Sequence, residues 1–153
     1  MKPKDIMIEA SKAVKSKNLI LAVELYNELL NKFPNHSGAR SGLKKIKRIT
    51  SHYKNAISQT ELNEAVSALQ IGSFQKAIDL AKKLILKDPN IAIIYNIIGI
   101  SYVHLKIPEK AISNFTTALR LEKNFNEARG NLGSALLLIG NIDDAIIQIE
   151  QTL

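Results

Sequence analysis

Three histidines and a few carboxylates are the residues of this chain that could support catalysis or bind a metal. His36, His52 and His104 are widely separated along the chain, and no Asp or Glu flanks them at a spacing typical of zinc sites. Cysteine is absent, which excludes disulfides, thiolate metal ligands and thiol nucleophiles. The sequence therefore predicts three surface histidines and no metal site.

Motifs for covalent or phosphate chemistry are also absent from the sequence. The chain lacks a G-x-S-x-G nucleophile motif, and Gly38 and Gly42 are spaced for neither a dinucleotide-binding turn nor a P-loop. Asp143 and Asp144 are adjacent carboxylates, and the first turn of a helix explains them because the helix dipole favours negative charge there. We expect no catalytic residue and no cofactor.

The strongest charge cluster is a basic patch of four residues, Lys44, Lys45, Lys47 and Arg48. Residues 1–57 contain 12 Lys/Arg against four Asp/Glu, so the net charge of +7 is concentrated in this part of the chain. Leu43, Ile46 and Ile49 recur at every third position, which predicts a helix with the basic patch on its outer face. Apart from Tyr53 no aromatic residue is interleaved for base stacking, so we expect no nucleic acid. The patch is a solvated helix face, or it contacts an acidic protein or an anionic lipid surface.

The composition is that of a folded protein without a membrane span. Hydrophobic residues make up 46% of the 153 residues and charged residues 23%. The most apolar window, Ile91 to Val103, is shorter than the roughly 20 residues that a membrane helix needs. The N-terminus has no apolar core typical of a signal peptide. We expect a cytoplasmic protein.

The elements that position these residues follow an internal repeat with a period of about 34 residues. Ala77, Ala111 and Ala145 are equally spaced and each is followed by isoleucine, and the same offset joins Gly99 to Gly133. Within one period, apolar residues recur at spacings of three and four in two runs, which predicts two amphipathic helices. The small residues in these runs allow the two helices to approach closely.

Short polar residues mark the predicted start of the second helix of each period. Asn18, Ser73 and Asn141 are candidate N-caps, because their side chains can accept from the unpaired N–H groups of a first turn. Ile107 takes this position in one period, and the following Pro108 fits the first helical position.

The period and its residue types resemble the tetratricopeptide repeat (TPR) family. With a start at Ala92, the residues that match the family pattern are Tyr95, Ile98, Gly99, Tyr102, Ala111, Phe115 and Ala118. Lys123 departs from it, since the family favours proline there. The resemblance implies an all-α fold, a right-handed α-solenoid of antiparallel helix pairs. The predicted order within a single solenoid domain 1–153 is a TPR-like unit over 1–35, an extra basic helix and linker over 36–57, TPRs over 58–91 and 92–125, and a TPR over 126–153 that is incomplete at its C-terminus.

In the TPR family, the first helices of the repeats line a concave groove that binds polypeptides. Carried over to this sequence, the groove residues are Asn63, Val66, Gln70, Ile93, Asn96, Ile97, Ile100, His104, Asn131 and Ser134. The carboxylate clamp of chaperone-binding TPR domains is not reproduced, because Glu127 stands where a cation would be needed. The resemblance therefore implies a protein or peptide partner, but not an acidic C-terminus held by that clamp.

Two apolar surfaces leave alternatives open. The predicted helix over 91–103 is apolar almost all round, so it either forms an apolar groove for a partner or is covered by its own neighbours. At the other end of the chain, several apolar side chains belong to helices with no successor, which predicts a homodimer through this end or a fragment of a longer protein; they are Leu136, Ile139, Ile142, Ile146 and Ile149.

Two functions are compatible with these patterns. The first is a non-catalytic interaction scaffold that binds a peptide, a helix or another copy of itself. The alternative is the N-terminal TPR domain of a larger bacterial enzyme, such as a sulfotransferase or glycosyltransferase, since such enzymes carry repeats similar to these. The Ile-, Lys- and Asn-rich composition indicates an AT-rich, bacterial coding sequence. The gene sequence beyond Leu153 separates the two, because a catalytic domain encoded there favours the alternative.

Overall fold

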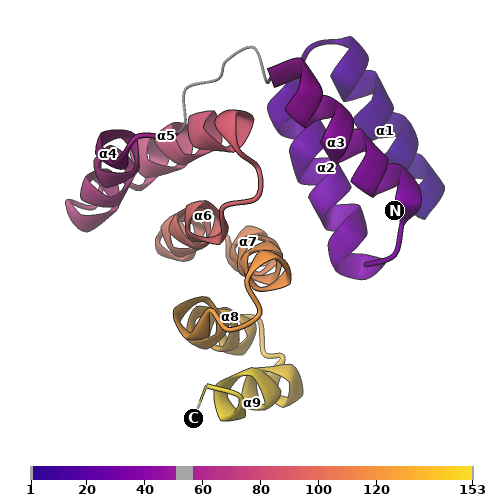
Figure 1. Cartoon of the computed structure of the whole chain (residues 1–153). Coiled ribbons are helices and arrows are strands. Elements are labelled where there is room, and N and C mark those ends of the chain that lie inside the picture. Colours follow the sequence, from indigo (N-terminus) through magenta and orange to yellow (C-terminus); the bar gives the residue numbers. More distant parts are fainter. Residues whose placement is uncertain (1, 51–56, 153) are drawn as a thin grey trace. The chain divides into compact units, whose positions relative to one another are not determined.

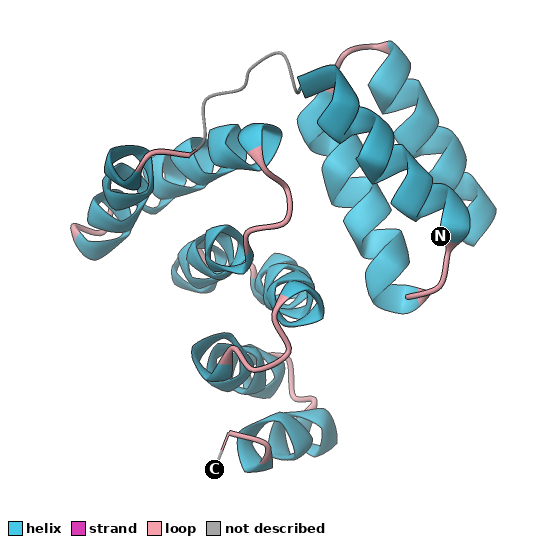
Figure 2. Cartoon of the chain, in the orientation of Figure 1, coloured by secondary structure: helices cyan, strands magenta, loops and turns pink. Residues whose placement is uncertain are grey.

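A computed structural model of the chain describes residues 2–50 and 57–152, and every regular element in these ranges is an α-helix (Figures 1 and 2). In chain order the helices are α1 (Pro3–Lys15), α2 (Leu19–Lys32), α3 (Ser37–Thr50), α4 (Gln59–Gln70), α5 (Phe74–Lys87), α6 (Ala92–His104), α7 (Pro108–Leu121), α8 (Asn126–Leu138) and α9 (Ile142–Glu150). The prediction of an all-α helical-repeat solenoid is confirmed. The helices α4, α6 and α8 begin at or next to positions 58, 92 and 126, the starts expected for three repeats. His52 and Tyr53 lie outside the described residues.

Contacts divide the chain into two compact units, which are described separately below. Unit 1 contains residues 1–58 together with 82–89, and unit 2 contains residues 59–81 together with 90–153. Helix α5 contributes its first residues to unit 2 and its last residues to unit 1. The repeat boundaries within the chain remain a prediction.

In unit 1, α3 packs against both α1 and α2. It begins at Ser37, one full period after the start of α1 at Pro3, so it occupies the sequence position of the first helix of a further repeat. The packing against α2 is close: a Cβ on Gly42 would lie 2.7 Å from Cε1 of Tyr26 and closer still to two other ring carbons. Glycine at this position therefore lets the ring of Tyr26 lie directly on the backbone of α3.

The buried side of α3 differs in one residue from the sequence interpretation. Ala39, Ile46 and Thr50 are buried, while Ile49 is 44% exposed. The interpretation of Ile49 as an inward-facing residue was therefore wrong, because the buried line follows spacings of seven and four rather than a constant three. Thr50 tolerates burial since its hydroxyl donates to the carbonyl oxygen of Ile46, 3.1 Å away.

In unit 2, the α6–α7 pair forms the most completely buried part of the fold. Phe115 on α7 is fully buried, and a Cβ on Gly99 of α6 would lie 2.7 Å from its Cδ1 and 2.9 Å from its Cζ. The next pair repeats this arrangement, with Gly133 of α8 against Ile149 of α9. The close helix approach expected at the small residues of the repeat is present in both pairs.

The predicted helix starts are confirmed at three second helices. The Oδ1 atom of Asn18 accepts from the backbone N–H of Leu21, 3.2 Å away, at the start of α2. Asn141 caps α9 in the same way, through the N–H of Asp144 at 3.4 Å. Helix α7 begins at Pro108 and its N-cap residue makes no side-chain cap. Proline has no N–H to satisfy at that position.

A left-handed residue precedes each of four second helices and was not predicted. These residues are Lys17, Gly72, Lys106 and Gly140, with φ angles of 60°, 78°, 61° and 75°. The last three follow one another at intervals of one period, so the turn is part of the repeat. Glycine adopts this conformation freely, whereas a residue with a Cβ is strained by about 1–2 kcal/mol. The two lysines therefore store strain in turns that the glycines form at lower cost.

Within the described ranges, no helix is both long and apolar enough to cross a membrane.

Candidate functional site

The first helices of unit 2, α4, α6 and α8, form the surface on which the sequence places a binding site, and we call it the first-helix face. Helix α6 contacts α4 on one side and α8 on the other. The predicted groove residues fall into three groups of exposure. Asn63, Gln70, Ile93, His104 and Ser134 are exposed, Val66, Ile100 and Asn131 are half-buried, and Asn96 and Ile97 are buried.

The two buried members of this set have structural roles. Ile97 is 3% exposed and is part of the core of unit 2. A ligand can therefore contact α6 through Ile93, which is 38% exposed, but not through the side chain of Ile97. Of the two alternatives for this apolar helix, cover by its own neighbours applies at Ile97, while Ile93 remains accessible.

Asn96 joins α6 to α8 through two hydrogen bonds. Its Nδ2 donates to Oε1 of Glu127 over 3.0 Å, and its Oδ1 accepts from Nδ2 of Asn131 over 3.1 Å. Asn96 is 2% exposed, so the Asn96 end of each bond is shielded from water, while Glu127 is exposed. Because a carboxylate can only accept, the amide orientation of Asn96 is fixed by Glu127, and the orientation of Asn131 follows from it.

Other polar groups of the face are held within single helices. Nε2 of Gln59 donates to Oδ1 of Asn63 over 2.9 Å on α4. On α8, the hydroxyl of Ser134 donates to the carbonyl oxygen of Gly130 over 3.0 Å. These bonds leave the amide N–H groups of Asn63 and the lone pairs of the Ser134 oxygen available for a ligand.

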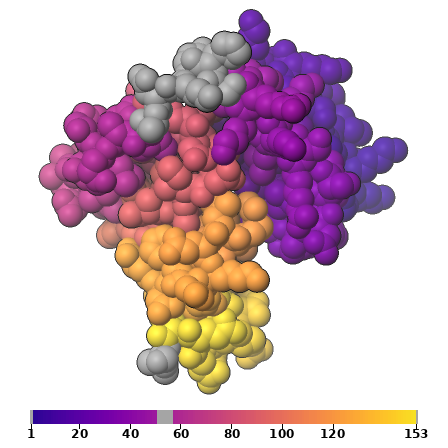
Figure 3. Space-filling model, viewed as in Figure 1, coloured from indigo at the N-terminus to yellow at the C-terminus, as the bar shows by residue number. Residues whose placement is uncertain are grey.

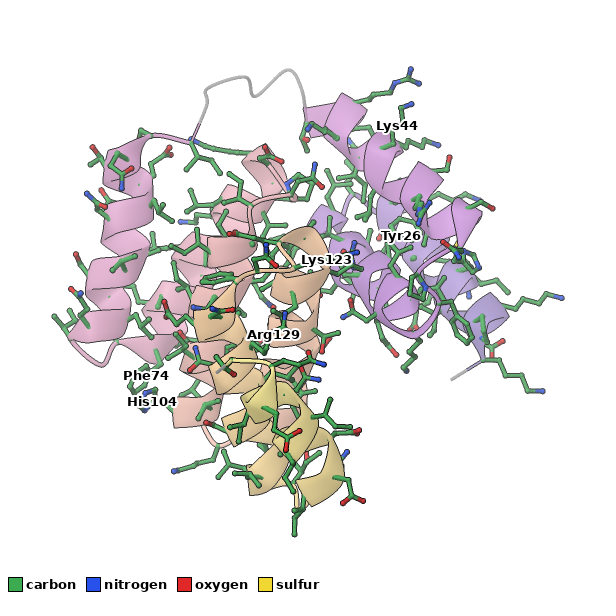
Figure 4. All side chains as sticks on the ribbon, turned by 60° about the horizontal axis from the view of Figure 1, so that its bottom comes forward. Tyr26, Lys44, Phe74, His104, Lys123 and Arg129 are labelled. Atoms are coloured by element: carbon green, nitrogen blue, oxygen red, sulfur yellow. The ribbon has the colours of Figure 1, made fainter. Side chains whose placement is uncertain are left out.

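His104 lies at the last position of α6 and stacks on Phe74, the first residue of α5 (Figure 4). The ring centroids are 4.3 Å apart and the planes differ by 2°. This predicted groove residue therefore contributes a flat aromatic surface at one end of α6.

Arg129 takes the position on α8 where the family favours an aromatic residue. Its Nη1 donates to Oε1 of Gln151 over 2.6 Å, and its Nη2 donates to the carbonyl oxygen of Lys123 (Figure 4). Its Nε is buried. The guanidinium therefore joins α8 to the turns on either side of the last helix pair, and both of its terminal nitrogens donate within the protein.

Comparison with known proteins adds to this geometry. Residues 108–153, which comprise α7, α8 and α9, match the family model described as "Tetratricopeptide repeat". The helix pairs, the repeat period and this match agree. The chain has the tetratricopeptide repeat fold, and residues 108–153 match the family itself.

A curated relative is similar in sequence to part of this chain. A peroxisomal targeting signal receptor of Candida albicans (strain SC5314 / ATCC MYA-2876) is 30% identical over 109 residues, which are 65% of this chain and 18% of the receptor. The TPR chain thus spans less than a fifth of the length of that relative.

Solved TPR structures share the fold. The TPR2AB domain of yeast Sti1, in a complex with pHSP90, has a TM-score of 0.65 at 17% identity and covers 98% of this chain and 60% of its own. The second TPR of Spaghetti (RPAP3), bound to the HSP90 peptide SRMEEVD, has a TM-score of 0.61 at 20% identity and covers 69% of this chain and 95% of its own. A crystal structure of MamA has a TM-score of 0.59 at 18% identity, with coverage of 99% and 90%.

The basic patch of this TPR protein lies on α3 in unit 1. Lys44, Lys45, Lys47 and Arg48 are all exposed, and Figure 4 marks Lys44. Nζ of Lys47 is 3.9 Å from Oδ1 of Asp88, an exposed ion pair of small energetic value. Whether the patch contacts an acidic protein or an anionic lipid stays a prediction.

An apolar surface is exposed on the last helix pair of the TPR array, and Figure 3 shows α9 at the end of unit 2. We call it the C-terminal patch, and its residues are Leu137, Leu138, Ile139, Ile142, Ile146, Ile147 and Ile149. Leu138 is 61% exposed and Ile142 is 58% exposed. Leu136, which the sequence places on the same surface, is 7% exposed and belongs to the core. The sequence analysis did not assign Leu137, Leu138 and Ile147 to this surface.

Among the described residues, no group of three or more His, Asp or Glu side chains is arranged to hold a metal ion. The third sequence-predicted surface histidine, His36, is half-buried, and its Nδ1 accepts from the backbone N–H of Ala39 over 3.2 Å. It therefore caps the start of α3 rather than facing a site.

Proposed function

We propose that this TPR protein is a non-catalytic interaction scaffold that binds a peptide or a helix of a partner protein on its first-helix face. The observation that carries the proposal is the accessible side chain of Ile93 on α6, a helix that contacts both α4, which carries the exposed Asn63, and α8, which carries the exposed Ser134. An apolar anchor flanked by hydrogen-bonding groups is the pattern that peptide-binding surfaces use. We also propose that the protein acts in the cytoplasm.

Known proteins with this fold support the proposal. The Spaghetti structure contains a bound HSP90 peptide, the Sti1 structure is a complex with pHSP90, and the curated relative is named as a receptor for a targeting signal. These are properties of those proteins. They make a polypeptide ligand the first class to test for this chain.

Selection from a displayed library of random peptides tests the binding proposal. We expect the wild-type protein to enrich peptides, and Ile93→Glu to lose them because a charged side chain removes the apolar anchor. Ile8→Glu is a matched control, since Ile8 is 45% exposed on α1 and lies outside the first-helix face. Binding that survives Ile93→Glu, or a library that yields no enriched peptide, would contradict the proposal.

We also propose that a second copy of the chain binds the C-terminal patch. Burial of apolar surface stabilises an interface by about 25 cal/mol per Å², and seven large apolar side chains are exposed here. We expect sedimentation to give a mass that rises with concentration toward twice 17.0 kDa. The double variant Ile142→Lys, Ile146→Lys should stay monomeric. A wild-type mass of one chain at every concentration would rule out this dimer.

A further inference from the structure

We infer that the partner segment carries a lysine or arginine side chain, and that Glu127 binds it at the edge of the first-helix face. This inference rests on the proposed function, because it names the chemistry of the ligand for the same surface. It is carried by the hydrogen-bonded row of Glu127, Asn96 and Asn131, which we call the acceptor row.

The direction of the hydrogen bonds decides what the acceptor row offers to a ligand. Asn96 uses Nδ2 toward Glu127, and Asn131 uses Nδ2 toward Asn96, so one N–H of each amide donates within the row and the chain of bonds ends on the Glu127 carboxylate. The second N–H of Asn96 is inaccessible because the residue is 2% exposed. What remains at the surface are Oε2 of Glu127 and Oδ1 of Asn131, which accept, and the second N–H of Asn131, so acceptors outnumber donors and the one charged group of the row is the Glu127 carboxylate.

The exposures of Glu127 and Asn131 agree with binding of a cationic side chain at the acceptor row. Glu127 is exposed and Asn131 is half-buried, so their remaining oxygen atoms can be reached from solvent. Among the described residues, the Glu127 carboxylate receives a hydrogen bond from Asn96 and forms no ion pair. A carboxylate that is oriented by a shielded amide is preorganised for a cationic donor.

The charged residues of the first helices also favour a basic ligand. Helices α4, α6 and α8 contain no lysine, and their acidic residues are Glu61, Glu64 and Glu127. The one arginine, Arg129, uses its terminal nitrogens on Gln151 and Lys123. The face therefore lacks an available lysine or arginine for a carboxylate ligand, and it favours a ligand of positive charge.

The peptides selected on the wild-type protein test the inference. We expect them to share one lysine or arginine, and we expect replacement of that residue by citrulline or norleucine to weaken binding about tenfold, since one charge-assisted hydrogen bond is lost. Glu127→Gln should weaken the unmodified peptide by a similar factor. The glutamine keeps an oxygen that accepts from Asn96, so the row itself is preserved.

Two comparisons make the test specific. Glu127→Gln combined with the neutral peptide should bind no more weakly than either change alone, because the two groups interact with each other. Glu122→Gln is the matched control. Glu122 is an exposed glutamate at the end of α7, and its substitution removes the same charge as Glu127→Gln. We expect this control to bind as the wild type does.

The outcomes distinguish this inference from the proposed function. One outcome overturns the inference alone: the enriched peptides share no basic residue, bind Glu127→Gln as they bind the wild type, and fail to bind Ile93→Glu. In that case the acceptor row does not bind a cation, and the scaffold proposal stands. A shared basic residue whose neutralisation leaves affinity unchanged also overturns the inference. If no peptide is enriched, the inference is overturned together with the proposed function.

Discussion

Replacing Ile97 by glutamate is expected to destabilise unit 2 by at least about 4 kcal/mol, because it places an unpaired carboxylate in the core. Ile97 is 3% exposed, between Asn96 and Ile98, which are also buried. The loss is comparable with the total stability of an ordinary domain, about 5–15 kcal/mol. Chemical denaturation followed by far-UV circular dichroism measures it, and we expect a large fall in the midpoint or a loss of helical signal.

Ile93→Glu is the matched control, since it is the same substitution one turn earlier on α6. Ile93 is 38% exposed, so its glutamate reaches solvent and should change stability by less than about 1 kcal/mol. The two variants thus distinguish a core position from a surface position on the same helix. Equal stability of the two variants would show that Ile97 is not enclosed as described.

Replacing Gly99 by alanine is expected to cost about 2–3 kcal/mol, although alanine is the better helix former. The new methyl group would lie 2.9 Å or less from three ring carbons of Phe115, and Phe115 is fully buried, so relief of the overlap requires the core to shift. The fall in midpoint should be partly reversed by Phe115→Leu in the same chain, because the smaller side chain relieves the overlap.

Gly130→Ala provides the opposite expectation. Gly130 also lies inside a helix of unit 2, but a Cβ there would meet no atom within 4 Å. Alanine should therefore stabilise the protein by about 0.5–1 kcal/mol through helix propensity alone. If both alanine variants gain stability, the close packing of Gly99 on Phe115 does not exist in solution.

The fold could be predicted because its determinants recur at a fixed interval. Gly99 and Gly133 are one period apart, and each lies against a large side chain of the following helix. Asn18 and Asn141 were recognised as caps from residue type alone, since a cap depends on the adjacent backbone rather than on distant packing.

The candidate site could be predicted only in part, because position in a repeat does not determine exposure. Ile97 and Asn96 were placed in the groove together with Ile93, and of these three only Ile93 has an accessible side chain. The acceptor row depends on how three side chains are oriented, which no periodicity encodes. The sequence did contain one signal, since Asn96 is 31 residues before Glu127 and 35 before Asn131, close to one period in both cases.

The left-handed turns could be predicted from the sequence only in part. Gly72 and Gly140 indicate a positive φ by their type, but Lys17 and Lys106 do not, and of these two lysines only Lys106 lies one period from the glycines. In the same way, the exposure of Ile49 could not be derived, because a constant spacing of three does not follow the buried side of α3.

The order of contacts along the chain has a consequence for how the protein folds. The helix contacts described join neighbours or next neighbours in sequence, such as α6 with α7 and α7 with α8. Such contacts require only short loops to close, so we expect assembly to be fast and to proceed outward from whichever pair forms first. The α6–α7 pair, which buries the aromatic ring of Phe115 completely, is the natural starting point in unit 2. Several apolar side chains of α9 remain exposed, so we expect its amides to exchange with solvent faster than those of α6.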